Sequence, residues 1–137
     1  MPVKGLSKHL ARLRRLQGPA MTKAVSKALF AAGELIEDEA KGLIMAGSVS
    51  GKQHVASLPG EPPNNDSFTL HNNIETARTA DPLVVTVTSN AEHSTPLEFG
   101  TSKMAARPFM RPARDAKVKE AQALVAKAVN QIAKKGA

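Results

Sequence analysis

The chain of 137 residues has no cysteine, no tryptophan and no tyrosine, and it has only four phenylalanines. The absence of cysteine excludes a disulfide scaffold and any metal site built on thiolates. The absence of Trp and Tyr removes most of the side chains on which single-stranded nucleic acids stack. A single domain of this length can nevertheless bury a hydrophobic core without a covalent staple.

Long apolar runs are also lacking, so the sequence predicts no membrane-spanning helix and no membrane partner. The N-terminus has neither an apolar core region nor a small-residue cleavage site, so we expect no secretory signal. The length suits one compact domain with appendages. We predict a basic N-terminal helix or arm over residues 1–18 and a single α+β domain over residues 19–137, with a long loop at 47–73.

Motifs that carry catalytic or metal chemistry are scarce. Gly51-Lys52 is similar to part of a phosphate-binding loop, but Gln53 stands where Ser or Thr would hold magnesium. The four histidines share no metal-ligand spacing with one another or with the acids, and we predict that they are solvated: His9, His54, His71 and His93. We therefore expect no enzyme activity, no cofactor and no metal site.

The acidic residues do not form a convincing acid–base pair either. Four of them lie close together on one predicted helix, and a solvated helix face explains them best: Glu34, Glu37, Asp38 and Glu39. Glu98 lies beside Phe99, at the end of a predicted strand. We interpret it as a structural ion pair with Arg107 or Arg111 rather than as a general base.

Charge is distributed unevenly along the chain, whose formal net charge is +7. Residues 1–27 have seven Lys or Arg and no acid, and residues 103–137 have nine bases and two acids. Residues 28–46 carry −3 and residues 47–102 carry −4. Both ends are thus basic and the middle is acidic, which favours an acidic protein surface or a polyanion as partner, or two opposite faces that meet in an assembly. Solvated helix faces are the alternative interpretation.

Three stretches have the apolar period of amphipathic helices. The first, over residues 3–16, repeats leucine in steps of four and three, with three cations beside the stripe: Lys8, Arg12 and Arg15. The second runs over residues 19–46, with Pro19 suited to its first turn and Glu37 to Lys41 as a favourable ion pair. The third begins near Pro112 and runs to about Lys134.

The middle of the chain predicts loops and short strands. Residues 47–73 are rich in Gly, Pro, Ser and Asn. Strand candidates follow at 74–79, at 83–88 (LVVTVT) and at 94–99, where Pro96 suggests an edge strand. Asp81-Pro82 predicts a tight turn, so the sheet should be antiparallel. The expected fold is α+β, with a small antiparallel sheet of three or four strands packed on one face against the long helix and the C-terminal helix.

The run Leu97–Ala113, LEFGTSKMAARPFMRPA, resembles the signature of the small tail-completion, or head–tail joining, proteins of long-tailed bacteriophages and prophages, which are similar to the lambda Z-type tail protein. The matching residues are Glu98, Phe99, Gly100, Thr101, Ser102, Lys103, Arg107, Pro108, Phe109, Arg111 and Pro112. A proline loop, Pro59–Pro63, followed by Thr69-Leu70 and Ile74, also resembles the family. The glycine and arginine that relatives usually have before that isoleucine are absent here. The resemblance covers about residues 19–130.

The resemblance implies a structural virion protein without catalytic residues, assembled in the bacterial host cytoplasm. Family members form a ring, expected to be a hexamer, at the neck between the upper end of the tail and the head connector. The implied partners are further copies of the chain, the adjacent tail terminator or tail tube ring, and the head connector or stopper ring. DNA passes through such a lumen without tight binding.

The physical chemistry of the signature agrees with an interface. Gly100 allows a chain path that a side chain could block. Arg107 and Arg111 can form bidentate hydrogen bonds with carboxylates. The alternative is a corner internal to the fold, with Phe99 and Phe109 in the core. A basic arm is the second candidate contact surface: Lys4, Lys8, Arg12, Arg14 and Arg15.

Two other functions stay open from the sequence. A tail terminator, which caps the tail tube, is the nearest alternative within a virion. A basic DNA-binding or packaging accessory protein is the alternative from another class, and it would bind DNA through phosphate contacts in a salt-dependent way.

Overall fold

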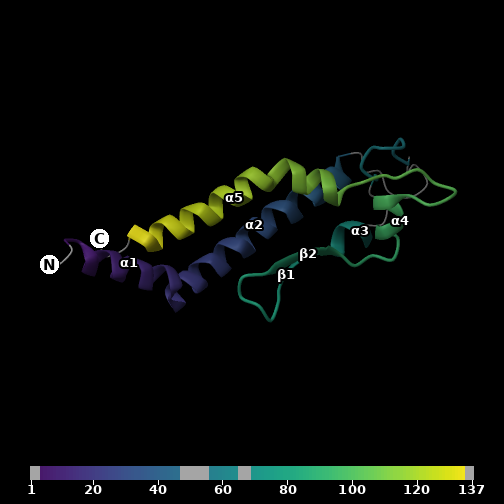
Figure 1. The fold of residues 1–137 in the computed structure, drawn as a ribbon. Coiled ribbons are helices and arrows are strands. Elements are labelled where there is room, and N and C mark those ends of the chain that lie inside the picture. The colour runs from purple at the N-terminus through teal and green to yellow at the C-terminus, as the bar shows by residue number, and fades with distance from the viewer. Residues whose placement is uncertain (1–3, 47–55, 65–68, 135–137) are drawn as a thin grey trace.

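The computed structural model describes residues 4–46, 56–64 and 69–134, and it has an α+β fold. The elements in chain order are α1 (Leu6–Gln17), α2 (Pro19–Met45), α3 (Thr69–Asn72), β1 (Ile74–Arg78), β2 (Val85–Ser89), α4 (Ser94–Phe99) and α5 (Met110–Lys134). The long helices α2 and α5 pack along each other, and the β1–β2 hairpin contacts α2 (Figure 1). The predicted fold class is confirmed at this level.

The three predicted helices all form. α2 begins with Pro19 in its first turn, where the missing N–H costs no hydrogen bond, and it extends over 27 residues. Its predicted ion pair is present, with Lys41 Nζ 2.7 Å from Glu37 Oε1. α5 begins two residues before Pro112 and ends at Lys134, so the prediction of this helix is confirmed with a small shift at its start.

The sheet is smaller than predicted, because the described residues contain two strands rather than three or four. β1 and β2 pair antiparallel, with Ile74 opposite Ser89 and Arg78 opposite Val85. The third candidate, Ser94–Phe99, is the helix α4, so the prediction of a strand there is wrong. Pro96 is the third residue of this helix, a first-turn position that proline tolerates and that the sequence alone does not distinguish from an edge strand.

The hairpin packs mainly on α2 and meets only the start of α5, whereas the prediction placed the sheet against both helices. Gly33 makes the close approach possible, because a Cβ atom there would lie 2.6 Å from Thr76 Cγ2. Thr76 Oγ1 donates to Glu37 Oε2 at 2.7 Å. At the other end of β1, the Arg78 guanidinium lies 4.7 Å from the centre of the Phe30 ring. These contacts make the hairpin and α2 one packed unit.

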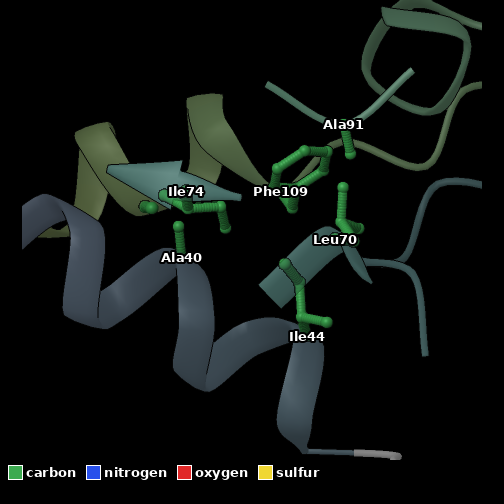
Figure 2. Packing of buried hydrophobic residues seen from close by; sticks show 7 residues of the cluster. Ala40, Ile44, Leu70, Ile74, Ala91 and Phe109 are labelled. Carbon is green, nitrogen blue, oxygen red and sulfur yellow. The ribbon is translucent and has the colours of Figure 1, made fainter. Parts of the chain in front are cut away.

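The hydrophobic core lies where α2, the hairpin and the start of α5 meet (Figure 2). Its fully buried large side chains are Phe109, Ile44 and Ile74. The small Ala40 of α2 lets Ile74 and Phe109 approach the helix closely, and Leu70 from α3 and Ala91 complete the cluster. Phe109 therefore holds the start of α5 in the core.

The remaining segments lie at the two ends of this unit. α1 lies beside the C-terminal end of α5 (Figure 1), where Arg15 Nη2 donates to the Ala133 carbonyl at 3.2 Å. Of the predicted loop at 47–73, residues 47–55 and 65–68 lie outside the described residues. The possible phosphate-loop residues Gly51, Lys52 and Gln53, and also His54, belong to the first of these two ranges. The described helices include none that is both long enough and apolar enough to cross a membrane.

Candidate functional site

Residues Leu97–Ala113, here called the corner, connect α4 to α5 and hold all the signature residues. Gly100 ends α4 with φ 76° and ψ 176°, a backbone conformation that is essentially restricted to glycine. A Cβ atom at Gly100 would lie 2.9 Å from both Ala106 N and Met104 O. The expectation that a side chain would block the chain path here is confirmed, although the element before it is a helix and not a strand.

A tight turn follows Gly100. Thr101 N donates to Met104 O at 2.8 Å, and Lys103 N donates to Thr101 Oγ1 at 3.2 Å. Thr101, Ser102 and Lys103 are exposed at the tip of this turn. The backbone hydrogen bonds give these side chains a fixed support on the surface.

The chain then returns past α4 toward Pro108. Arg107 N donates to Leu97 O at 2.6 Å, and Ala106 O accepts a hydrogen bond from Gly60 N at 2.9 Å. The proline loop and the signature therefore touch each other, a contact between distant segments that no local sequence signal indicates. Arg107 is partly buried, and its Nη1 lies 3.6 Å from Met104 Sδ. Its Nε is buried without a hydrogen-bond partner among the described residues.

Glu98 caps the N-terminus of α5. Its Oε2 accepts hydrogen bonds from Phe109 N at 2.9 Å and Met110 N at 3.1 Å, and its Oε1 accepts one from Arg111 N at 3.0 Å. The next residue, Pro112, has no N–H. Every backbone N–H at the start of α5 that lacks a partner within the helix is therefore bound by Glu98. The carboxylate also lies at the positive end of the helix dipole.

The predicted ion pair of Glu98 with Arg107 or Arg111 is wrong, because no such ion pair occurs among the described residues. Backbone amides take the carboxylate instead, since the helix start is aimed directly at it. Arg111 is exposed and forms no ion pair among the described residues. The arginine therefore stays available for contacts outside the corner.

The two phenylalanines of the corner have opposite environments. Phe109 is fully buried, whereas Phe99 is 78% exposed. The alternative that places both rings in the core is therefore wrong for Phe99. Phe99 lines a surface cavity of about 590 Å³ together with Val87, Met110 and Arg111. The corner thus presents an aromatic ring and a cation beside a partly apolar hollow.

The cations of the predicted arm lie at the other end of the molecule. Lys4, Lys8, Arg12 and Arg14 are exposed on or next to α1, and Arg15 is partly buried against α5. Lys8, Arg12 and Arg15 line a cavity of about 560 Å³ together with Lys134 of α5. Sequence reasoning identified the arm but missed Lys134, since only the fold brings the two basic ends of the chain together.

The leucine stripe of α1 is not buried as its period suggests. Leu6 is 48% exposed, Leu10 42% and Leu13 40%. These leucines are offset by two residues, about 200° of helix rotation, from the cations that line the cavity. α1 therefore directs its cationic side toward α5 and leaves its leucines at the surface.

The acids of α2 do not form one solvated face. Glu37 lies against the hairpin, and its burial raises its pKa, but hydrogen bonds from Lys41 and Thr76 outweigh burial and lower the pKa overall below 4.5. Glu39 Oε2 lies 3.9 Å from Lys117 Nζ of α5. Of these four acids, only Glu34 and Asp38 are exposed as predicted. No group of three or more His, Asp or Glu side chains in the described part of the chain is arranged to hold a metal ion.

The arrangement contains two surfaces suited to binding, the corner with Phe99 and the cationic cavity between α1 and α5. They lie at opposite ends of α5. A scan of protein-family models, a search of curated proteins and a search of solved structures each found no match to the chain.

Proposed function

We propose that this chain is a structural virion protein that forms a ring at the neck of a long-tailed phage and completes the tail for joining to the head. The ring would be a hexamer, in contact with the tail terminator or tail tube on one side and the head connector or stopper on the other. The protein acts by binding and not by catalysis.

The corner is the observation that carries this proposal. Its run of residues resembles the tail-completion signature, and both segments of that resemblance meet at the hydrogen bond between Gly60 N and Ala106 O. The same corner holds Phe99 78% exposed on a support of backbone hydrogen bonds. An exposed aromatic ring on a fixed backbone is typical of a protein-binding surface, because aromatic side chains often supply much of the binding energy when a partner buries them.

Charge separation also supports an assembly role. The described residues 4–27 and 121–134 contain nine Lys or Arg and no acid. All the described acids lie in the rest of the molecule. A chain with one cationic end and an acid-bearing body has the two complementary patches that head-to-tail contacts in a ring need.

The test is electron microscopy of lysates from a phage or prophage deleted for this gene, with the wild-type gene supplied in trans as control. DNA-filled heads beside separate tails of normal length are the expected result. Tails of abnormal length would instead favour the tail terminator function. Intact, infectious virions would contradict both functions.

A Phe99→Ala variant tests the corner directly. Because Phe99 is 78% exposed, the substitution should change the free energy of unfolding by less than about 0.5 kcal/mol. We expect it to reproduce the deletion phenotype nonetheless. Leu83→Ala is the matched control, since Leu83 is 52% exposed in the turn of the hairpin, away from the corner. Normal virions with Phe99→Ala would exclude the corner as the contact.

The DNA-binding alternative is supported by the same cationic end. It predicts salt-dependent binding of duplex DNA by the isolated chain. Under the joining function the cations bind protein, so we expect no submicromolar affinity for duplex DNA at physiological salt. A submicromolar dissociation constant would favour the alternative.

A further inference from the structure

The cavity between α1 and α5 is lined by several cationic side chains. Lys8, Arg12, Arg15 and Lys134 line it, and no Asp or Glu among the described residues does. Within the described ranges, Lys8 and Arg12 form no hydrogen bond or ion pair, and both are exposed. Arg15 is fixed by its bond to Ala133 O, and its Nε is buried without a hydrogen-bond partner among the described residues. Several cationic side chains around one cavity attract a ligand with more than one negative charge.

The complementary charges are on α2 of the same chain. Gly33 and Glu37 face the hairpin, and Glu39 faces α5 through Lys117. Glu34 and Asp38 lie on the remaining side of the helix, exposed and without an ion pair within the described ranges. The nearby Lys41 is already bound to Glu37 at 2.7 Å.

The two sets of charges match in spacing. Glu34 and Asp38 are one helical turn apart, and so are Lys8 and Arg12. Like charges one turn apart repel each other, so each pair is unfavourable in the isolated chain and becomes favourable when it faces the other. Two helices that meet along these sides can form two charge pairs at once.

This contact cannot form within one chain. Asp38 is 19 residues beyond Pro19, about 28 Å along the axis of α2. α1 lies beyond the start of α2, beside the far end of α5 (Figure 1). Arg12 and Asp38 of one molecule are therefore held apart by the rigid helix between them.

We propose that the cavity between α1 and α5 binds the Glu34–Asp38 side of α2 from a second copy of the chain. The contact is head-to-tail, because it uses two different patches of each copy, and such contacts build rings or filaments. This inference rests on the proposed ring and deepens it by naming a subunit interface. Carboxylates of a second copy are favoured over DNA phosphates because the chain itself carries the matched, unpaired acids.

The absence of cysteine allows a direct test by disulfide trapping. Chains with Arg12→Cys are mixed with chains that carry Asp38→Cys and are then oxidised mildly. We expect a covalent heterodimer in high yield. The matched control is Arg12→Cys mixed with Glu92→Cys, because Glu92 is also exposed but lies outside the proposed interface. Equal trapping with Glu92→Cys would overturn the proposal.

Charge reversal supplies the second test, with sedimentation velocity as the readout. K8E/R12E and E34K/D38K should each weaken self-association by about tenfold or more, and a mixture of the two should restore it. Wild-type association should also weaken between about 0.05 M and 0.5 M salt, as screening predicts. Circular dichroism checks that each variant keeps its helices.

Three results would overturn the proposal: a wild-type chain that stays monomeric at submillimolar concentration in low salt, a mixture that does not restore association, or duplex DNA binding that depends on Lys8 and Arg12 without self-association. These measurements use the purified protein. Their failure is therefore distinguishable from failure of the joining function, which the deletion phenotype tests in the virion.

Discussion

Glu98→Ala tests whether the corner is built on the cap of α5. The change removes both oxygens that accept from Phe109 N, Met110 N and Arg111 N, at 2.9, 3.1 and 3.0 Å. Loss of an N-cap acceptor costs about 1 kcal/mol, and loss of a negative charge at the positive end of a helix costs about 0.3–1 kcal/mol. Phe109 N belongs to a fully buried residue, which adds about 1 kcal/mol for an unsatisfied amide. The expected total is about 2–3 kcal/mol.

The free energy of unfolding is best measured by urea titration followed by far-ultraviolet circular dichroism, because the chain has no Trp or Tyr fluorophore. Glu98→Gln should lose about half as much, since one of its two terminal atoms still accepts hydrogen bonds. Arg111→Ala distinguishes the helix cap from an ion pair between Glu98 and Arg111 as the source of stability. It leaves the backbone N–H of residue 111 in place, so it should change the free energy of unfolding by less than about 0.5 kcal/mol. A Glu98→Ala chain as stable as wild type, or an Arg111→Ala chain as unstable as Glu98→Ala, would refute the capping argument.

Three further predictions concern the elements that fix the two ends of the molecule and the hairpin. Gly100→Ala should destabilise the chain by about 3 kcal/mol or more in the same titration, because it combines a glycine-only conformation with backbone atoms 2.9 Å from the new Cβ; a neutral result would contradict the geometry of the turn. Arg15→Ala should cost about 1 kcal/mol and speed amide exchange in α1, whereas the exposed Arg14→Ala should do neither. Because the pKa of Glu37 is lowered on folding, the unfolded chain binds more protons, so its contribution to stability is present above about pH 4.5 and is lost as the pH falls through the lower folded value. Glu37→Gln should therefore flatten the dependence of unfolding free energy on pH in that acidic range, and an unchanged slope would count against the hydrogen bonds from Lys41 and Thr76.

The helices could be predicted from the sequence because their signals are local. The alanine and leucine period and the first-turn Pro19 define α2, and the prediction of 19–46 differs from the observed helix by one residue. The hairpin was predictable for the same reason: Asp81 accepts from Leu83 N at 2.9 Å and forms the tight turn that Asp81-Pro82 suggests. Local propensity and tertiary structure agree in these segments.

The site was harder to predict because its contacts join distant segments. Six residues containing one proline are compatible with an edge strand or a short helix, and only the backbone bonds of α4 decide between them. Opposite charges near Glu98 suggested an ion pair, but the fold aims three backbone amides at that carboxylate. The order of residues could not indicate that Phe99 is exposed while Phe109 is buried, since that difference depends on which way the chain turns after Gly100.

α5 connects the two candidate binding surfaces and is fixed at both ends by side chains from other elements. A carboxylate, Glu98, binds amides at its positive end, and a guanidinium, Arg15, binds a carbonyl at its negative end. Its 25 residues span about 37 Å, so a stiff helix sets the separation between the corner and the cationic cavity. A subunit that must contact one neighbour through its corner and another through its basic end needs such a fixed separation, because a flexible connection would lose entropy each time both contacts formed.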